Sequence, residues 1–170
     1  MKKALIAAAA TAVVLLAVGG GAGAVAVPAF DQAWLQHSIQ GDRFEITGGM
    51  WAERHAQTPQ VKALAAQVVG NHRHALNEAV KVAHELGIKV PMAPSDTQKW
   101  QLQQLKTMSG QKFERAYTTL EIADHMEDIE QTQMELQKGS SAAIKHLAST
   151  ALPMLRVHLM LSKLAYKAAV

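Results

Sequence analysis

Three of the eight histidines in this sequence stand where a helix would turn them toward a protein interior. His72 follows Val68 by four residues within an apolar stripe, and His158 follows Met154 at the same spacing within another. His125 shares a helical face with acidic neighbours that are four residues before it and three after it. Because imidazole is a ligand for zinc, copper, iron and manganese, these positions predict a buried transition-metal ion.

Carboxylates complete the predicted set of ligands. Glu45 lies on the first helical segment, and Asp128 comes three residues after His125. Bundles build metal sites from one ligand per helix, so we expect a common interior site formed by Glu45, His72, His125, Asp128 and His158. The same residues also fit a second interpretation, a buried polar network in which histidines and carboxylates bond to one another without a metal.

The remaining histidines and the other acidic residues carry weaker signals. We expect partial or full exposure of His37, His55, His74, His84 and His146. Glu121, Asp124 and Asp128 gather carboxylates on one helix and could support acid–base chemistry. Charged residues on a bundle helix more often form its solvent-facing side.

Patterns typical of enzymes are weak in this chain. A di-iron site of the ferritin type needs Glu-x-x-His pairs. No histidine here is preceded at that spacing by an acidic residue; the residues found there are Trp34, Ala52, Val69, Asn71, Lys81, Ile122, Ala143 and Leu155. The sequence also contains no G-x-S-x-G, phosphate-binding glycine loop or H-E-x-x-H. These patterns favour a protein that is not an enzyme.

Composition removes further classes of function. The 170 residues contain no cysteine, which excludes disulfides, thiolate metal sites, cysteine nucleophiles and a lipid-modified cysteine. The net charge of +3 falls to about +1 without Lys2 and Lys3, which leaves 15 Lys and Arg against 14 Asp and Glu. The basic residues are scattered along the sequence, whereas a nucleic-acid surface needs a concentrated basic stripe. We therefore expect no nucleic-acid partner.

The N-terminal segment predicts export. Residues 1–26 have the layout of a signal peptide: a basic start, an uncharged Ala, Val and Leu run, and small residues in an A-x-A pattern. We expect cleavage after Ala24 or Ala26, with Ala29 as an alternative. An uncleaved membrane anchor is the rival, since residues 4–30 carry no charge. Either way, the domain at residues 30–168 is expected in the periplasm or cell envelope.

Helical periodicity covers the chain beyond this leader, and strand signals are missing. We expect a first helix over residues 31–57, interrupted or loosened near Gly41 and Gly48-Gly49. Thr58 as a cap and Pro59 at the first helical position predict the start of a second helix. Gly87 stands where a C-terminal cap belongs.

Two more long helices and one short helix are expected after a proline-containing loop at residues 88–94. Ser95 and Gln98 predict a capping box at the start of the short helix. A third long helix is expected to end at Gly139, and a fourth to begin after Ser140 or Ser141. The chain is therefore predicted to be all-α, a four-helix bundle with a short extra helix between helices two and three.

The order of several segments resembles that of exported bacterial proteins with a ferritin-like domain of unknown function, the four-one-four-two type. The resemblance spans about residues 33–164 and rests on GDRFEI at 41–46, PQVKALA at 59–65, VGNH at 69–72, LGI at 86–88, FERAY at 113–117, ADH at 123–125 with Asp128, and LPMLRVHL at 152–159. It implies a ferritin-like bundle in the cell envelope without a settled activity. The family's histidine and acidic positions fall on the five predicted ligands, but Asn71 stands where the family has an aspartate.

We therefore expect an exported ferritin-like bundle that binds a transition-metal ion at a buried histidine and carboxylate centre and is not an enzyme. One alternative is a ferritin-like oxidase or peroxide-handling enzyme. Another is a metal-free bundle with a structural role or with a protein partner in the envelope.

Overall fold

The computed structural model describes residues 26–169, which form five helices and no strand. The helices are α1 (Ala29–His55), α2 (Pro59–Glu85), α3 (Asp96–Lys106), α4 (Gly110–Lys138) and α5 (Ala142–Ala168). None of the helices within these residues is both long enough and apolar enough to span a bilayer. The predicted signal peptide lies outside the described residues except for its last one.

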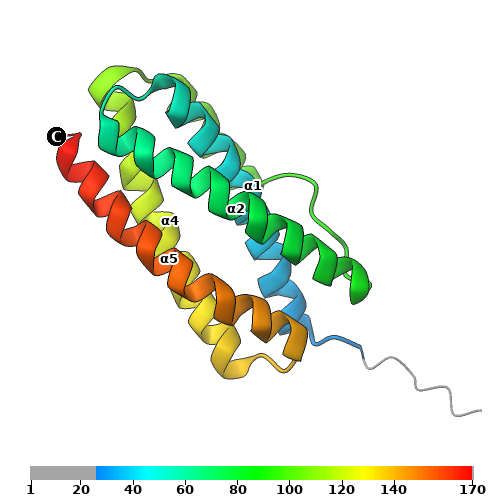
Figure 1. Ribbon diagram of the computed structural model, residues 1–170. Coiled ribbons are helices and arrows are strands. Elements are labelled where there is room, and N and C mark those ends of the chain that lie inside the picture. The colour runs from blue at the N-terminus through cyan, green and yellow to red at the C-terminus, as the bar shows by residue number, and fades with distance from the viewer. Residues whose placement is uncertain (1–25, 170) are drawn as a thin grey trace, which may run out of the picture.

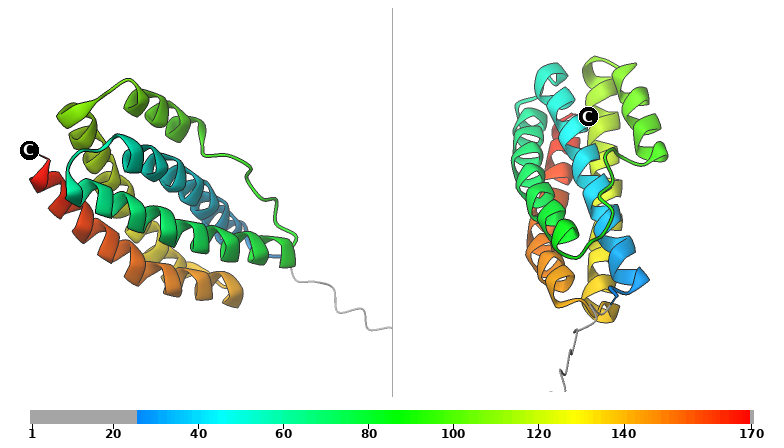
Figure 2. Two further views of the ribbon diagram at one scale, coloured as in Figure 1. Left: turned by 45° about the horizontal axis from the view of Figure 1, so that its top comes forward. Right: turned by 90° about the vertical axis from the view of Figure 1, so that its right-hand side faces the viewer.

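Two antiparallel helical hairpins, α1 with α2 and α4 with α5, make up the bundle (Figure 1). The hairpins meet mainly where α2 packs on α5, and α1 also contacts α4. Residues 86–109 return along the bundle from the end of α2 to the start of α4 and contain α3, which packs on α1 and α4 (Figure 2). A single long crossover is the connectivity of ferritin-like bundles. The predicted four-helix bundle with a short extra helix is confirmed.

Helix ends follow the residues that predicted them. Gly87 adopts φ +65°, and the backbone N–H of Ile88 donates to the Ala83 carbonyl at 2.8 Å, which closes a Schellman motif after α2. The predicted capping box at α3 is present, because the Ser95 and Gln98 side chains each accept from the other residue's backbone N–H. These local bonds stop α2 and start α3 where the chain must turn into the crossover.

Helix α1 differs from expectation, because it runs without interruption through Gly41 and Gly48-Gly49. A Cβ atom at Gly49 would lie 2.7 Å from Cγ2 of Val69 and 3.2 Å from the Ala65 carbonyl oxygen. The glycine therefore serves close packing of α1 on α2 rather than a break in the helix.

Carboxylates from other helices hold the two hairpin loops. Thr58 begins α2 as predicted but does not cap it; its hydroxyl instead donates to Oε2 of Glu114 at 2.6 Å. Oδ1 of Asp31 accepts the backbone N–H groups of Ser140 and Ser141 at 2.9 and 2.7 Å. Each hairpin loop is thus hydrogen-bonded to a helix of the other hairpin. These bonds fix the position of one hairpin along the axis of the other.

Glu135 of α4 is a second buried carboxyl group near the α4–α5 loop. Burial, and then the charge of Asp31, raises the pKa of Glu135 to about 7, while Lys145 opposes the shift. A protonated Glu135 can donate to the Asp31 carboxylate, so this end of the bundle favours one proton shared by two acids.

The interior consists of two apolar clusters with a polar layer between them. The upper cluster in Figure 1 includes Ala52, Val61, Leu64, Val68, Phe113, Tyr117 and Ala165. The lower cluster includes Trp34, Leu35, Ile39, Ala79, Ala83, Ile144 and Ala148. The polar layer contains Asp42, Glu45, His72, Glu121, His125 and His158, each at most 4% exposed. On α2, for example, His72 lies between Val68 of one cluster and Ala79 of the other.

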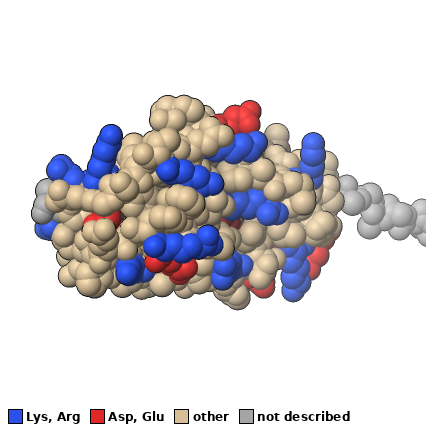
Figure 3. All heavy atoms as spheres, turned by 90° about the horizontal axis from the view of Figure 1, so that it is seen from above, with Lys and Arg blue, Asp and Glu red and all other residues tan. Residues whose placement is uncertain are grey.

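Surface charge is mixed. Figure 3 shows Lys and Arg side chains that stand apart on one face of the bundle, with acidic side chains between several of them. Inside the bundle, the polar layer gathers six buried ionisable side chains.

Candidate metal centre

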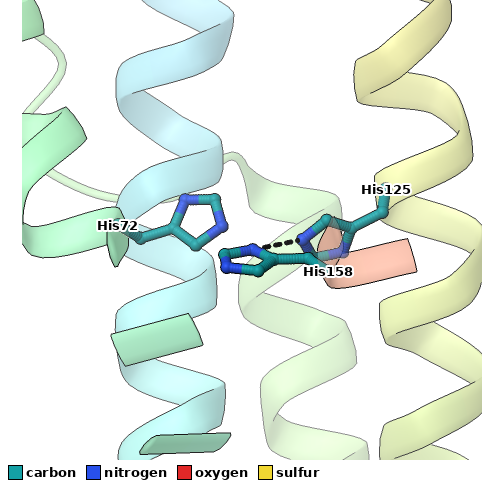
Figure 4. A group of neighbouring side chains, drawn as sticks. All are labelled: His72, His125 and His158. Atoms are coloured by element: carbon teal, nitrogen blue, oxygen red, sulfur yellow. Dashed lines mark hydrogen bonds between the residues drawn. The ribbon is translucent and has the colours of Figure 1, made fainter. Parts of the chain in front are cut away.

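Three helices each place one histidine in the polar layer: α2 supplies His72, α4 supplies His125 and α5 supplies His158 (Figure 4). All three side chains are 2% exposed or less. One nitrogen of each ring lies within 4.8 Å of the corresponding nitrogens of the other two. Nε2 of His125 and Nδ1 of His158 are 3.1 Å apart, the pair that Figure 4 joins by a dashed line.

Hydrogen bonds at the outer nitrogens set the tautomers of two rings. Nδ1 of His72 donates to Oδ1 of Asp42 at 2.8 Å, and Nδ1 of His125 donates to the backbone carbonyl of Glu121 at 2.8 Å. Nε2 of His125 therefore carries a lone pair, and Nε2 of His72 carries one when that ring is neutral. Nε2 of His72 is buried and has no hydrogen-bond partner among residues 26–169. A histidine held by a carboxylate with its other nitrogen bare is prepared to bind a metal.

The side chain of Asn71 determines which nitrogen of His158, the third ring, carries the proton. The nitrogen of the Asn71 side-chain amide (Nδ2) is 3.0 Å from Nε2 of His158, so the structure has the amide oriented to donate. If the amide nitrogen donates, Nδ1 of His158 keeps its proton and donates to His125, which satisfies the pair without a metal. If the amide oxygen accepts, Nδ1 of His158 turns a lone pair toward the lone pair of His125, and a cation is needed between them. The asparagine thus permits both a closed and a ligand-ready arrangement.

Burial controls the charge on the three rings. Burial, followed by the positive charge of His72, lowers the pKa of His125 to about 4 and that of His158 to about 3. For His72, burial also favours the neutral ring, but the hydrogen bond and charge of Asp42 outweigh it and raise the pKa. His125 and His158 are therefore neutral near pH 7, the form in which imidazole binds metals.

Glu45 approaches the centre from α1 on the other side of His125. Its Oε1 is 3.9 Å from Nδ1 of His125, and Oε2 of Glu121 is 3.7 Å from the same nitrogen. Glu121 is only 3% exposed, so its assignment to a solvent-facing side of the helix is wrong. Glu121 precedes His125 by one helical turn, and this spacing was the feature of the sequence that could have indicated its burial.

The structure brings four of the five predicted ligands into the polar layer and leaves Asp128 outside both groups of potential ligands. Oδ1 of Asp128 instead lies 3.3 Å from Nε2 of His37 near the surface. Asp42 was missed by sequence reasoning, although it precedes Glu45 by three residues on the same helical face. His37 is partly exposed, and four further histidines are exposed as expected: His55, His74, His84 and His146.

A surface pocket leads toward His72. It has a volume of about 430 Å³ and is lined by Trp34, Asn71, His74, Glu78, His146 and Met154, among others. A smaller cavity of about 30 Å³ shares Trp34 and Met154 with this pocket and reaches Asp42 and His72. Met154 and Trp34 thus line both the surface pocket and the cavity beside His72.

Comparison with known proteins agrees with this fold. None of the curated proteins matches the chain. The crystal structure of a DUF305 fragment from Deinococcus radiodurans is similar, with a TM-score of 0.74 and 14% identity over 84% of this chain and 99% of that one. CopM in its Cu(II)-bound form has a TM-score of 0.68 and 16% identity over 81% of this chain and 95% of that one. Residues 17–163 match a family model, and the chain belongs to the family described as Domain of unknown function (DUF4142).

Proposed function

We propose that this protein binds a transition-metal ion, with copper as the preferred metal, through His72, His125 and His158, and that it does not catalyse a reaction. The observation that carries the proposal is the convergence of three buried imidazoles with Nε2 of His72 lacking a partner among the described residues. Buried polar atoms are almost always bonded, so a bare nitrogen in this position calls for a ligand.

The chemistry of the donors supports copper or zinc. Imidazole suits both metals, and no cysteine is available in the sequence. A protein of similar fold has been solved with Cu(II) bound, which favours copper between the two. His72, His125 and His158 would hold the ion, while Asp42 and the Glu121 carbonyl would orient two of the rings.

Two other functions make different predictions. In a metal-free bundle, the bonds from Asn71 through His158 to His125 would serve only stability. In a ferritin-like oxidase or peroxide-handling enzyme, redox chemistry would depend on the same histidines. The missing Glu-x-x-His pairs argue against the enzyme, since Glu121 precedes His125 by four residues rather than three.

The proposal includes export to the periplasm or cell envelope, on the strength of the signal-like residues 1–26. The mass of the protein isolated from its producing cells tests this part. Removal of the leader after Ala24 or Ala26 is expected, and a chain of full mass in the membrane fraction would instead support the uncleaved anchor.

Metal content tests the central proposal. The full chain would be expressed with its own leader, purified without a histidine tag, loaded with copper, dialysed and analysed by elemental mass spectrometry. We expect about one copper per chain, lost in the triple variant His72→Ala, His125→Ala, His158→Ala. A matched triple variant of exposed histidines, His55→Ala, His84→Ala, His146→Ala, should keep its copper. Equal copper in both variants, or none in the native protein, would reject the proposal.

A further inference from the structure

The side of His125 that faces away from the other two histidines holds a second group of buried polar atoms. Both carboxylate oxygens of Glu45, Oε2 of Glu121 and the hydroxyl of Tyr117 are buried and have no hydrogen-bond partner within the part of the chain that the structure describes. Glu45 is 1% exposed, Glu121 3% and Tyr117 0%. Asp124, one turn after Glu121, adds a further buried oxygen without a partner.

The unpartnered oxygens converge on one place. One oxygen each of Glu45 and Glu121 lies within 4.8 Å of the other and of a nitrogen of His125. The charges of Glu121 and Glu45 both act on Tyr117, and with burial they raise the pKa of its hydroxyl well above the ordinary value. These side chains come from two helices, α1 and α4, so the group is built by the packing of the bundle rather than by one helical face.

Among the residues that the structure describes, no Lys or Arg forms an ion pair with Glu45 or Glu121. The ion pairs of Glu45 and Glu121 among residues 26–169 involve only His125, whose own pKa is lowered to about 4. Burial, followed by the charge of Glu121, raises the pKa of Glu45 well above its usual range, and burial raises that of Glu121 to about 7. Isolated carboxylates are costly to bury, and they are retained in proteins when they are paired or bind a cation.

We infer that Glu45 and Glu121, assisted by Tyr117, form a second cation site that takes a divalent ion preferring oxygen ligands, of the class of Mn²⁺. Carboxylate and hydroxyl oxygens suit Mn²⁺ and Mg²⁺, whereas the three imidazoles on the other side of His125 suit copper or zinc. His125 separates the two sites, because its Nε2 faces His158 and its Nδ1 lies beside the carboxylates. The second site does not depend on copper at the first.

Titration of the full chain with Mn²⁺ tests this inference. Binding is measured as the loss of the electron paramagnetic resonance signal of free Mn²⁺. We expect about one Mn²⁺ per native chain, and binding weakened by about 100-fold in both Glu45→Gln and Glu121→Gln. These amide replacements keep side-chain size and remove a buried charge, and circular dichroism would confirm that they fold. Glu135→Gln is the matched control, because Glu135 is another buried glutamate of α4 with a raised pKa, and it lies in neither group of potential ligands. It should bind Mn²⁺ like the native protein.

The double variant His72→Ala, His158→Ala separates this inference from the proposed copper site. We expect it to keep Mn²⁺ and lose copper, while Glu45→Gln keeps copper and loses Mn²⁺. Mn²⁺ lost in the double variant and kept in Glu45→Gln would place the ion among the histidines and overturn the inference. Absence of Mn²⁺ binding by the native chain would overturn it as well, and would show that the carboxyl groups instead share protons. Copper binding absent everywhere would reject the proposed function alone.

Discussion

Replacement of Asp42 by asparagine changes one charge in the bond that orients His72 and leaves the rest of the centre in place. The carboxylate accepts Nδ1–H of His72 at 2.8 Å, and both side chains are at most 5% exposed. An asparagine oxygen can still accept this proton, so the tautomer of His72 is retained. What is lost is the negative charge that makes Nε2 a stronger metal ligand.

The size of the effect follows from the role of such supporting carboxylates. Their loss weakens metal binding by about 10- to 100-fold. At a free copper concentration of about 100 times the native Kd, binding stabilises the native fold by about 2.7 kcal/mol. The same copper concentration would stabilise Asp42→Asn by only about 0.4 to 1.4 kcal/mol, because its Kd is then approached rather than greatly exceeded.

Urea denaturation with and without copper measures this difference. Asp96→Asn provides the control, since Asp96 is a fully exposed carboxylate paired only with Lys99. We expect the control to gain about as much from copper as the native protein does. A native-sized gain in Asp42→Asn would refute the claim that Asp42 supports a metal ligand, whatever the change in metal-free stability.

Three further predictions concern packing, protonation and access. Gly49→Ala should destabilise the protein by about 1 to 3 kcal/mol, because the new Cβ would meet Val69. Gly70→Ala has open space at its Cβ and should stabilise the protein by about 0.5 to 1 kcal/mol. Urea denaturation measures both variants, and midpoints that shift in the same direction would contradict this prediction. The pKa of Glu135 is raised from 4.5 to about 7 in the folded protein. Protonated Glu135 therefore contributes fully to the free energy of unfolding below pH 4.5, and this contribution is lost as the pH rises through 7. Glu135→Gln should therefore match the native protein near pH 4.5 and exceed it by about 1 to 3 kcal/mol at pH 8, and an equal urea midpoint at pH 8 would count against the buried acid pair. Met154→Ala should speed copper uptake several-fold in stopped-flow measurements, because it removes a side chain that lines both the surface pocket and the cavity beside His72. Met160→Ala is the control, since Met160 is exposed on the same helix and its removal should leave the rate unchanged. Equal rates in the two variants would exclude entry of copper past Met154.

Local signals predicted the elements of the fold well. Pro59, Gly87 and the Ser95–Gln98 pair act through bonds within a few residues, so their effect can be anticipated without knowledge of tertiary structure. Gly49 misled the prediction, because a glycine in a helical pattern signals either weakness or close packing. Only the approach of α2, with Val69 at the missing Cβ, distinguishes the two.

The candidate centre was partly predictable for a related reason. Helical periodicity identifies the face on which a residue lies, and this was sufficient for His72, His125 and His158. Periodicity does not identify how two neighbouring helices are aligned along their axes, and therefore which of their residues lie opposite each other. Asp128 shares the face of His125 but lies about 4.5 Å farther along the axis, where α1 presents His37 instead of the centre. Asp42 was missed for the converse reason, since its bond to His72 depends on how α1 and α2 are aligned.

X-ray absorption spectroscopy of the copper-loaded protein tests the central claim most directly, because it reports the atoms bound to the ion. We predict nitrogen or oxygen neighbours at about 2 Å with the outer scattering of about three imidazole rings. The triple variant His72→Ala, His125→Ala, His158→Ala, loaded in the same way, should lose that outer scattering. A sulfur neighbour, or imidazole scattering that survives in the triple variant, would contradict a copper site at these three histidines.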